Sequence, residues 1–189
     1  MSLFGSSGIR GIVGADFTVD LAAKIGNAVG SLHGEIIHGR DPRLSGLMVL
    51  QALAAGETAA GTQVYDAGMV PTPTLAMAAE DFDCGIMISA SHNPYYDNGI
   101  KLINSNGEKM DEETILLVED YIDGKLRLFG QEWKELPYAH KDAIGCTVDY
   151  VAGRNRYMGY LISLGVYSFK GMKVCLLYTS PSPRDGATS

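Results

Sequence analysis

The chain has 189 residues, of which 46% are hydrophobic, so it is long enough to fill one domain of roughly 100–150 residues and to leave a remainder. Its formal net charge of -7 and its lack of a basic run argue against nucleic acid or an anionic membrane as the main partner, because phosphate groups bind clustered Lys and Arg. Its cysteines have no metal-binding spacing, and it has neither a signal peptide nor an apolar stretch of about 20 residues, so we expect a cytoplasmic protein.

Helix and strand patterns alternate from residue 18 onward. Thr18 is a good N-cap for a helix whose apolar positions follow helical spacing as far as Leu32, and Gly34 ends it. Residues 35–38 predict a strand, residues 44–60 an alanine-rich helix closed by Gly61, and residues 62–65 a second strand.

The alternation continues through residue 124. The segment "VPTPT" opens a helix that runs to residue 80, residues 84–88 and 99–103 predict strands, and residues 111–123 predict a helix with acidic residues in its first turn. The strand at 84–88 is apolar on both faces, which indicates a sheet covered on both sides. We therefore predict an α/β fold for residues 1–140, a three-layer α/β/α sandwich with a mixed, largely parallel sheet.

The chain changes character after residue 140. A helical pattern begins near Thr147, and "KGMKV" predicts a strand, so we assign residues 147–174 to the truncated start of a second α/β domain. The composition of residues 175–189 fits a disordered tail, but "CLLYTSPSPRD" also resembles one reading frame of a sequencing adapter. We interpret this tail as non-native and expect the natural protein to be longer.

The stretch "MISASHNPYYDNGIK" carries the first candidate for chemistry. Ser91 follows a buried strand, where its hydroxyl can reach a substrate as a nucleophile. Its neighbours do not form the G-x-S-x-G elbow of serine hydrolases, which argues against that class. The alternative is a turn stabilised by polar side chains ahead of Pro94.

Two further loops suggest an anionic ligand. "FGSSGIRG" offers glycine-freed backbone N–H groups, the hydroxyls of Ser6 and Ser7, and Arg10. "GRDPR" adds Arg40 and Arg43 after another strand. Either loop alone also fits a solvated or salt-bridged segment. Together with Lys101, their cations favour a phosphorylated ligand in an otherwise acidic protein.

Five motifs then occur in a characteristic order: "FGSSGIRG", "GRDPRLS", "VPTPT", "SASHNPYYDNGIK" and "GEKM". In order and spacing they resemble the N-terminal domain of the α-D-phosphohexomutases over residues 3–125, most closely the branch that acts on glucosamine phosphates. The resemblance implies a hexose phosphate substrate and intramolecular phosphotransfer through a phosphoserine at Ser91. Phosphomannomutase or phosphoglucomutase activity, or a non-catalytic phosphosugar-binding module, are the alternatives.

The resemblance also implies roles for individual residues. Arg10 and Lys101 would be catalytic with Ser91, Lys101 as the general acid/base, and His92 either handles a proton or supports the loop. Mg²⁺ would bind Ser91 through its phosphate, with its other ligands outside this chain. Contacts to phosphate or substrate are expected from Ser6, Ser7, Arg10, Arg40, Arg43, Asn93 and Lys101.

Some expectations concern supporting residues and the chain as a whole. Asn98-Gly99 is expected to form the turn that aims Lys101. The other histidines, His33, His38 and His140, are expected at the surface or at helix ends. The family's three further domains are missing from this sequence, so we expect the fragment to be inactive alone. The oligomeric state is left open.

Overall fold

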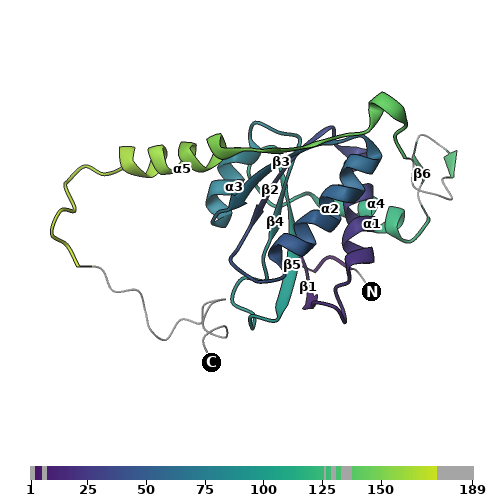
Figure 1. Cartoon of the computed structure of the whole chain (residues 1–189), viewed down its shortest axis with the longest axis horizontal. Coiled ribbons are helices and arrows are strands. Elements are labelled where there is room, and N and C mark those ends of the chain that lie inside the picture. Colours follow the sequence, from purple (N-terminus) through teal and green to yellow (C-terminus); the bar gives the residue numbers. More distant parts are fainter. Residues whose placement is uncertain (1–2, 6–7, 126, 129–130, 133–137, 174–189) are drawn as a thin grey trace.

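The computed structural model describes residues 3–5, 8–125, 127–128, 131–132 and 138–173. Ser6, Ser7 and the tail predicted for residues 175–189 lie outside the described residues. Figure 1 shows a central sheet with helices packed against it and the last helix extending away from it.

The described residues form a six-stranded sheet in the order β1-β5-β4-β2-β3-β8. The strands are β1 (Ile9–Ile12), β5 (Asp97–Asn104), β4 (Cys84–Ile88), β2 (Glu35–Arg40), β3 (Gln63–Met69) and β8 (Thr147–Asp149). The strands from β4 to β8 are parallel, whereas β5 is antiparallel to both of its neighbours. The predicted mixed, largely parallel sheet is therefore confirmed.

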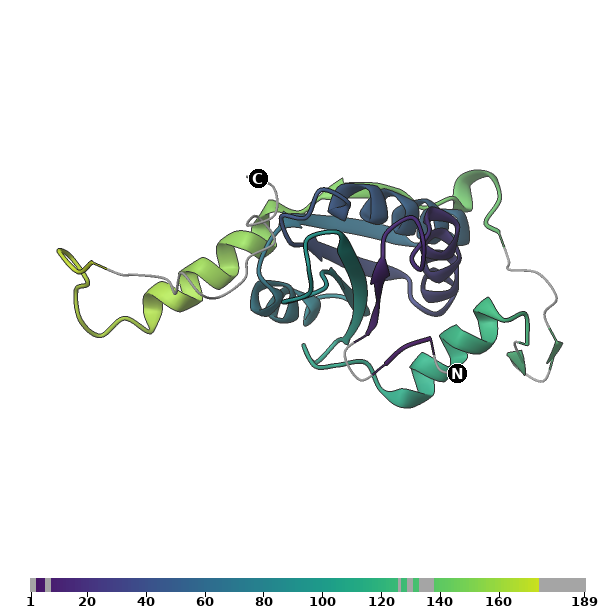
Figure 2. The ribbon, with the colours of Figure 1, turned by 90° about the horizontal axis from the view of Figure 1, so that it is seen from below.

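Helices cover both faces of the sheet, which confirms the three-layer sandwich (Figure 2). On one face lie α1 (Val19–Leu32), α2 (Gly46–Ala60) and α4 (Glu112–Ile122), and on the other lie α3 (Thr72–Ala79) and α5 (Val151–Ser163). Strand β4 contributes to the hydrophobic cores on both faces of the sheet. Ile86 and Ile88 pack in the core under α1, α2 and α4, and Met87 packs in the core under α3. Its unbroken apolar run follows directly from this double burial.

Local signals set the helix ends. The Thr18 hydroxyl accepts a hydrogen bond from the Leu21 amide at 3.2 Å, and the Asp111 carboxylate accepts one from the Thr114 amide at 2.8 Å. Gly61 closes α2 with a φ of 100°, a conformation that glycine adopts without steric cost. The caps at Thr18 and Gly61 agree with the sequence predictions, whereas Asp111, predicted as the first residue of its helix, lies one position before it as the N-cap.

The N-terminal segment differs from its prediction. Part of the expected glycine-rich loop is strand β1, which pairs with β5 so that Arg10 lies opposite Gly99. A Cβ at Gly99 would lie 2.3 Å from the carbonyl oxygen of Ile9, so glycine allows the two strands to approach. The turn predicted at Asn98-Gly99 is wrong, because both residues lie inside β5 and Asn98 is buried.

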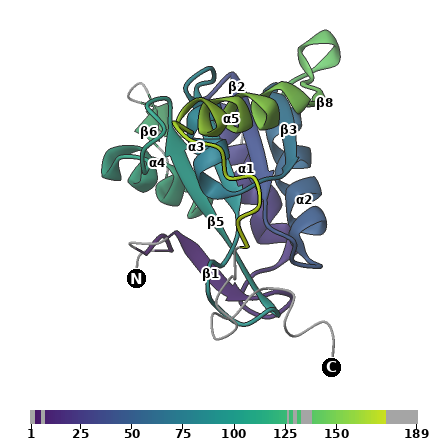
Figure 3. The same ribbon diagram turned by 90° about the vertical axis from the view of Figure 1, so that its left-hand side faces the viewer.

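The C-terminal part also begins differently. Residues 147–149 form β8, parallel to β3, and the helix predicted from about Thr147 starts at Val151. Helix α5 lies beside α3 (Figure 3). Tyr150 packs against Phe82 with ring centroids 5.2 Å apart. Between α4 and β8 lie two short strands, β6 (Arg127–Leu128) and β7 (Gln131–Glu132), and a 3-10 turn, η1 (Lys141–Ala143). A second domain over residues 147–174 stays a prediction.

One histidine departs from its expected position. His38 lies fully buried in β2, with its Nε2 2.9 Å from Oε1 of Glu57, which is also fully buried. His33 follows the end of α1 and His140 is exposed, as expected. Among the described residues, no helix is both long enough and apolar enough to cross a bilayer.

Candidate functional site

The candidate site forms where β2 and β4 end and β5 begins. The two parallel strands finish at the same edge of the sheet, and the Asp41 amide after β2 donates to the Ile88 carbonyl of β4 at 3.1 Å. Ser91 lies three residues beyond β4 and is exposed. Loops at this edge of an open α/β sheet are where such folds bind ligands.

Ser91 has an unusual backbone conformation. Its φ of 58° lies in the left-handed region, which a non-glycine residue rarely adopts. Strain of this kind persists only where surrounding contacts hold it, and it concentrates at functional sites. The conformation therefore separates Ser91 from an ordinary turn serine.

A short hydrogen-bond chain holds the amide side of Ser91. The Ser91 N–H donates to the Ser89 hydroxyl at 3.0 Å, and that hydroxyl donates to Oδ2 of Asp41 at 2.8 Å. Sequence reasoning assigned neither Ser89 nor Asp41 to the site. Asp41 lies inside "GRDPR" and Ser89 lies two residues before Ser91, so the motifs contained both residues without showing that they meet.

The side-chain N–H donors of Arg43 are all used in hydrogen bonds within the protein. Its side chain is fully buried and donates from Nε to Asp41, from Nη1 to the carbonyls of Pro94 and Asp97, and from Nη2 to those of Ser91 and Asn93. A guanidinium has five N–H donors, and here all five are used. In this arrangement Arg43 has no donor left for the phosphate contact that the sequence predicted.

Arg10 reaches the serine loop from β1. Its Nη1 donates to Oδ1 of Asn93 at 3.2 Å, and Nδ2 of Asn93 donates to Oδ2 of Asp97 at 3.0 Å. The Nε of Arg10 is buried and has no hydrogen-bond partner among the described residues. The structure thus brings Arg10 to the loop that contains Ser91 and Asn93, although Arg10 lies 83 residues before Asn93 in the chain.

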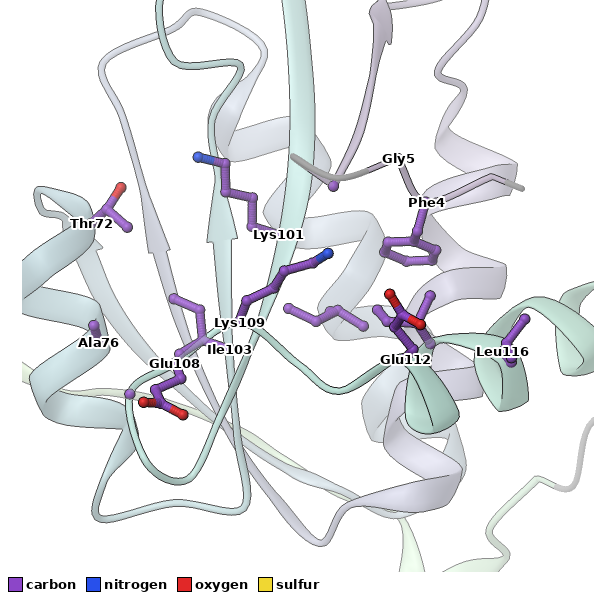
Figure 4. A pocket seen from close by; sticks show the side chains of 14 residues that line it. Phe4, Gly5, Thr72, Ala76, Lys101, Ile103, Glu108, Lys109, Glu112 and Leu116 are labelled. Carbon is purple, nitrogen blue, oxygen red and sulfur yellow. The ribbon is translucent and has the colours of Figure 1, made fainter. Parts of the chain in front are cut away.

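Lys101 lies on β5 and lines a cavity of about 640 Å³ together with Thr72, Lys109 and Glu112 (Figure 4). Partial burial, and then the positive charge of Arg10, lower the pKa of the Lys101 ammonium below its usual value. A lowered pKa makes the neutral amine more accessible, which suits proton transfer.

The remaining predicted site residues are Arg40, His92, Ser6 and Ser7. Arg40 ends β2, and its buried Nε has no partner among the described residues. His92 is exposed, and its side chain makes no hydrogen bond within the part of the chain that the structure describes. Ser6 and Ser7 fall in the gap between residues 5 and 8, so their predicted contacts stay predictions.

The described residues do not form a magnesium site. They contain no group of three or more His, Cys, Asp or Glu side chains placed to hold a metal ion. Near Ser91, Asp41 accepts from Arg43 and Ser89, and Asp97 accepts from Asn93. Because Mg²⁺ needs near-octahedral oxygen coordination, we derive no step through a metal from this chain.

Comparisons with known proteins give one consistent result. Residues 1–127 match the family described as phosphoglucomutase/phosphomannomutase, alpha/beta/alpha domain I. The phosphoglucosamine mutases of Lachnospira eligens and Lachnoclostridium phytofermentans are 51% and 47% identical over 183 and 180 residues, each match covering 92% of this chain and 39% of the relative.

A solved structure agrees. A phosphoglucomutase/phosphomannomutase family protein from Burkholderia thailandensis superposes with a TM-score of 0.66 at 28% identity, over 86% of this chain and 35% of that chain. The chain thus spans about 39% of the length of the two curated relatives.

Proposed function

Because the chain belongs to the phosphoglucomutase/phosphomannomutase family, we propose that it forms the phosphoserine-bearing domain of a hexose phosphate mutase. The family match confirms the resemblance that the five motifs indicated. For the substrate we propose glucosamine 6-phosphate, converted to glucosamine 1-phosphate, because phosphoglucosamine mutases are among the relatives with 51% and 47% identity.

The observation that carries this proposal is the conformation of Ser91. An exposed serine held at a φ of 58° beyond a buried strand, with Arg10 hydrogen-bonded into its loop, fits a residue that must present an oxygen in one direction. A non-catalytic binding module would need cations around the ligand but gains nothing from a strained serine. The geometry therefore favours the enzyme over the binding module.

The proposed reaction transfers a phosphoryl group from Ser91 to a hydroxyl of the hexose phosphate. The bond from phosphorus to Ser91 Oγ breaks and a bond from phosphorus to the sugar oxygen forms, while the sugar hydroxyl loses its proton and Ser91 Oγ takes one up. In the second half, Ser91 Oγ gives up its proton and bonds to the other phosphorus of the bisphosphate. The bond from that phosphorus to its sugar oxygen breaks, and that oxygen takes up a proton, which yields the isomeric monophosphate.

Two side chains support this transfer. Lys101 is the proposed acceptor of the proton from the sugar hydroxyl, because burial and Arg10 lower its pKa and so favour the proton-accepting form. Arg10 stabilises the phosphoserine, which carries close to two negative charges. Mg²⁺ remains part of the proposal as the ion that neutralises further charge when bound, with its protein ligands supplied from outside the described residues.

The test is a chimera that joins residues 1–173 of this chain to the remaining length of the Lachnospira eligens enzyme. With glucosamine 6-phosphate, Mg²⁺ and a hexose bisphosphate primer, we expect turnover and a phosphopeptide containing Ser91. Ser91→Ala should abolish both, whereas Ser105→Ala, in an exposed turn, should retain both. An active chimera without phosphate on Ser91, or an inactive chimera beside an active parent enzyme, would contradict the proposal. The 189-residue chain alone should show no sustained turnover.

A further inference from the structure

The Ser91 loop is organised around a single guanidinium. Arg43 donates to the carbonyl oxygens of Ser91 at 3.0 Å, Asn93 at 2.9 Å and Asp97 at 2.8 Å, and also to that of Pro94. These carbonyls span the whole connection from Ser91 to the start of β5. Backbone carbonyls that turn inward in a loop need donors, and here one buried side chain supplies them.

The same arginine is fixed by Asp41. Nε of Arg43 lies 2.9 Å from Oδ2 of Asp41, and the Arg43 amide donates to Oδ1 of the same carboxylate at 3.1 Å. The Arg43 side chain is fully buried and that of Asp41 is 12% exposed. The carboxylate balances the buried charge, so the guanidinium is held in one orientation.

Both peptide groups of Ser91 are attached to this ion pair. Its N–H reaches Asp41 through the Ser89 hydroxyl, and its C=O accepts directly from Arg43. Rotation of Ser91 toward a negative φ would break these contacts. The left-handed conformation of Ser91 thus follows from its two attachments to one Asp–Arg pair, 48 to 50 residues earlier in the chain.

We propose that Asp41 and Arg43 form a clamp that sets the direction of the Ser91 hydroxyl, with Arg43 as a positioning residue and not a phosphate ligand. The geometry of the clamp stands independently, but its purpose rests on the proposed phosphoryl transfer. Lysine cannot replace this arginine. Its three N–H donors share one nitrogen, so they cannot reach the separate carbonyl oxygens that the two Nη atoms of the guanidinium contact.

The clamp and the phosphate-ligand hypothesis predict different kinetics for Arg43→Lys. A lost ligand to the substrate phosphate would raise KM. A misdirected nucleophile lowers kcat and the rate of Ser91 phosphorylation by about 10²-fold, since a displacement of about 1 Å has that effect. KM should stay unchanged, because all five donors of Arg43 are used within the protein.

The first experiment is hydrogen exchange in the 189-residue chain. The amides of Ser91, Asn93 and Asp97 are hydrogen-bonded within the loop and report its opening. Arg43→Lys should speed their exchange roughly tenfold or more, while the core amides of β4 and β5 stay protected. The control is Arg156→Lys, at an arginine paired with Glu80 and Asp81 on the surface, which should leave the loop unchanged.

A second variant covers the case in which Arg43→Lys does not fold. Ser89→Ala removes only the connection between the Ser91 amide and Asp41, and it should speed exchange at Ser91. Unchanged exchange of the loop in Ser89→Ala, or in a folded Arg43→Lys, overturns the clamp.

The second experiment measures kcat, KM and phosphorylation of Ser91 in the chimera that carries Arg43→Lys. A lower kcat at constant KM supports the clamp, and a raised KM with normal phosphorylation overturns it. If the wild-type chimera neither turns over nor carries phosphoserine, the proposed function fails, and the exchange experiment still decides whether Arg43 holds the loop.

Discussion

The close contact between α1 and α2 allows a quantitative prediction about the helix layer on one face of the sheet. A Cβ on Gly26 of α1 would lie 2.1 Å from the carbonyl oxygen of Leu53, and a Cβ on Gly56 of α2 would lie 2.1 Å from that of Ala23. The obstructing atoms belong to the backbone, so no change of rotamer can relieve the overlap. Gly26→Ala can be accommodated only if the helices separate.

The expected magnitude follows from two opposing effects. Alanine favours a helix over glycine by about 1 kcal/mol. Restoring a contact of at least 3.0 Å from 2.1 Å requires a displacement that loosens the packing of Ile25 and Leu53, both fully buried. Overpacking costs typically about 1–3 kcal/mol and occasionally more, and here the cost lies above that range because backbone must move. We expect a net loss of about 2–3 kcal/mol, which lowers Tm by roughly 4–12 °C.

Thermal unfolding followed by circular dichroism measures this effect. The matched control is Gly159→Ala on α5, where a Cβ would meet nothing within 4 Å, so only the helix preference changes and Tm should stay equal or rise. A Tm for Gly26→Ala at or above that of the wild type would refute the close helix contact.

Three further predictions concern individual side chains. Ser91→Gly should be more stable than Ser91→Ala by about 1 kcal/mol in denaturant unfolding, because glycine adopts a φ of 58° without steric cost; equal stabilities would mean that Ser91 is not strained. Because burial and Arg10 lower the pKa of Lys101, competitive acetylation should give its titration midpoint below the usual lysine value, and Arg10→Gln should raise that midpoint; an ordinary midpoint would contradict the burial of its ammonium. At pH values between the folded and the unfolded pKa of Lys101, the unfolded chain binds more protons than the folded chain, so Lys101 makes the fold more stable as pH rises. Burial raises the pKa of the Cys84 thiol, so a thiol reagent should label exposed Cys146 in the folded chain and Cys84 only after unfolding, as located by peptide mass spectrometry; equal labelling rates would contradict the buried position of Cys84.

The sequence was sufficient for features that depend on neighbouring residues. Thr18 and Asp111 cap helices by accepting from amides three residues ahead, and Gly61 ends α2 through its own backbone freedom. The apolar run at 84–88 indicated a strand buried on both sides, because each residue of a strand faces one layer or the other. The motifs around Ser91 likewise identified the family, since their order and spacing are properties of the chain itself.

Only the tertiary structure decided which distant groups meet. Strand β1 forms because Arg10 and its neighbours pair with β5 nearly 90 residues later, and no short-range pattern specifies that register. His38 is buried in contact with Glu57, which α2 contributes 19 residues later. The residue type and loop of Arg43 suit a phosphate-binding cation and a positioning residue equally well, and the positioning role that we propose could not be found from the sequence. That proposed role depends on the carbonyls of Ser91 to Asp97, which lie 48 to 54 residues away and meet Arg43 only when β2, β4 and β5 have assembled.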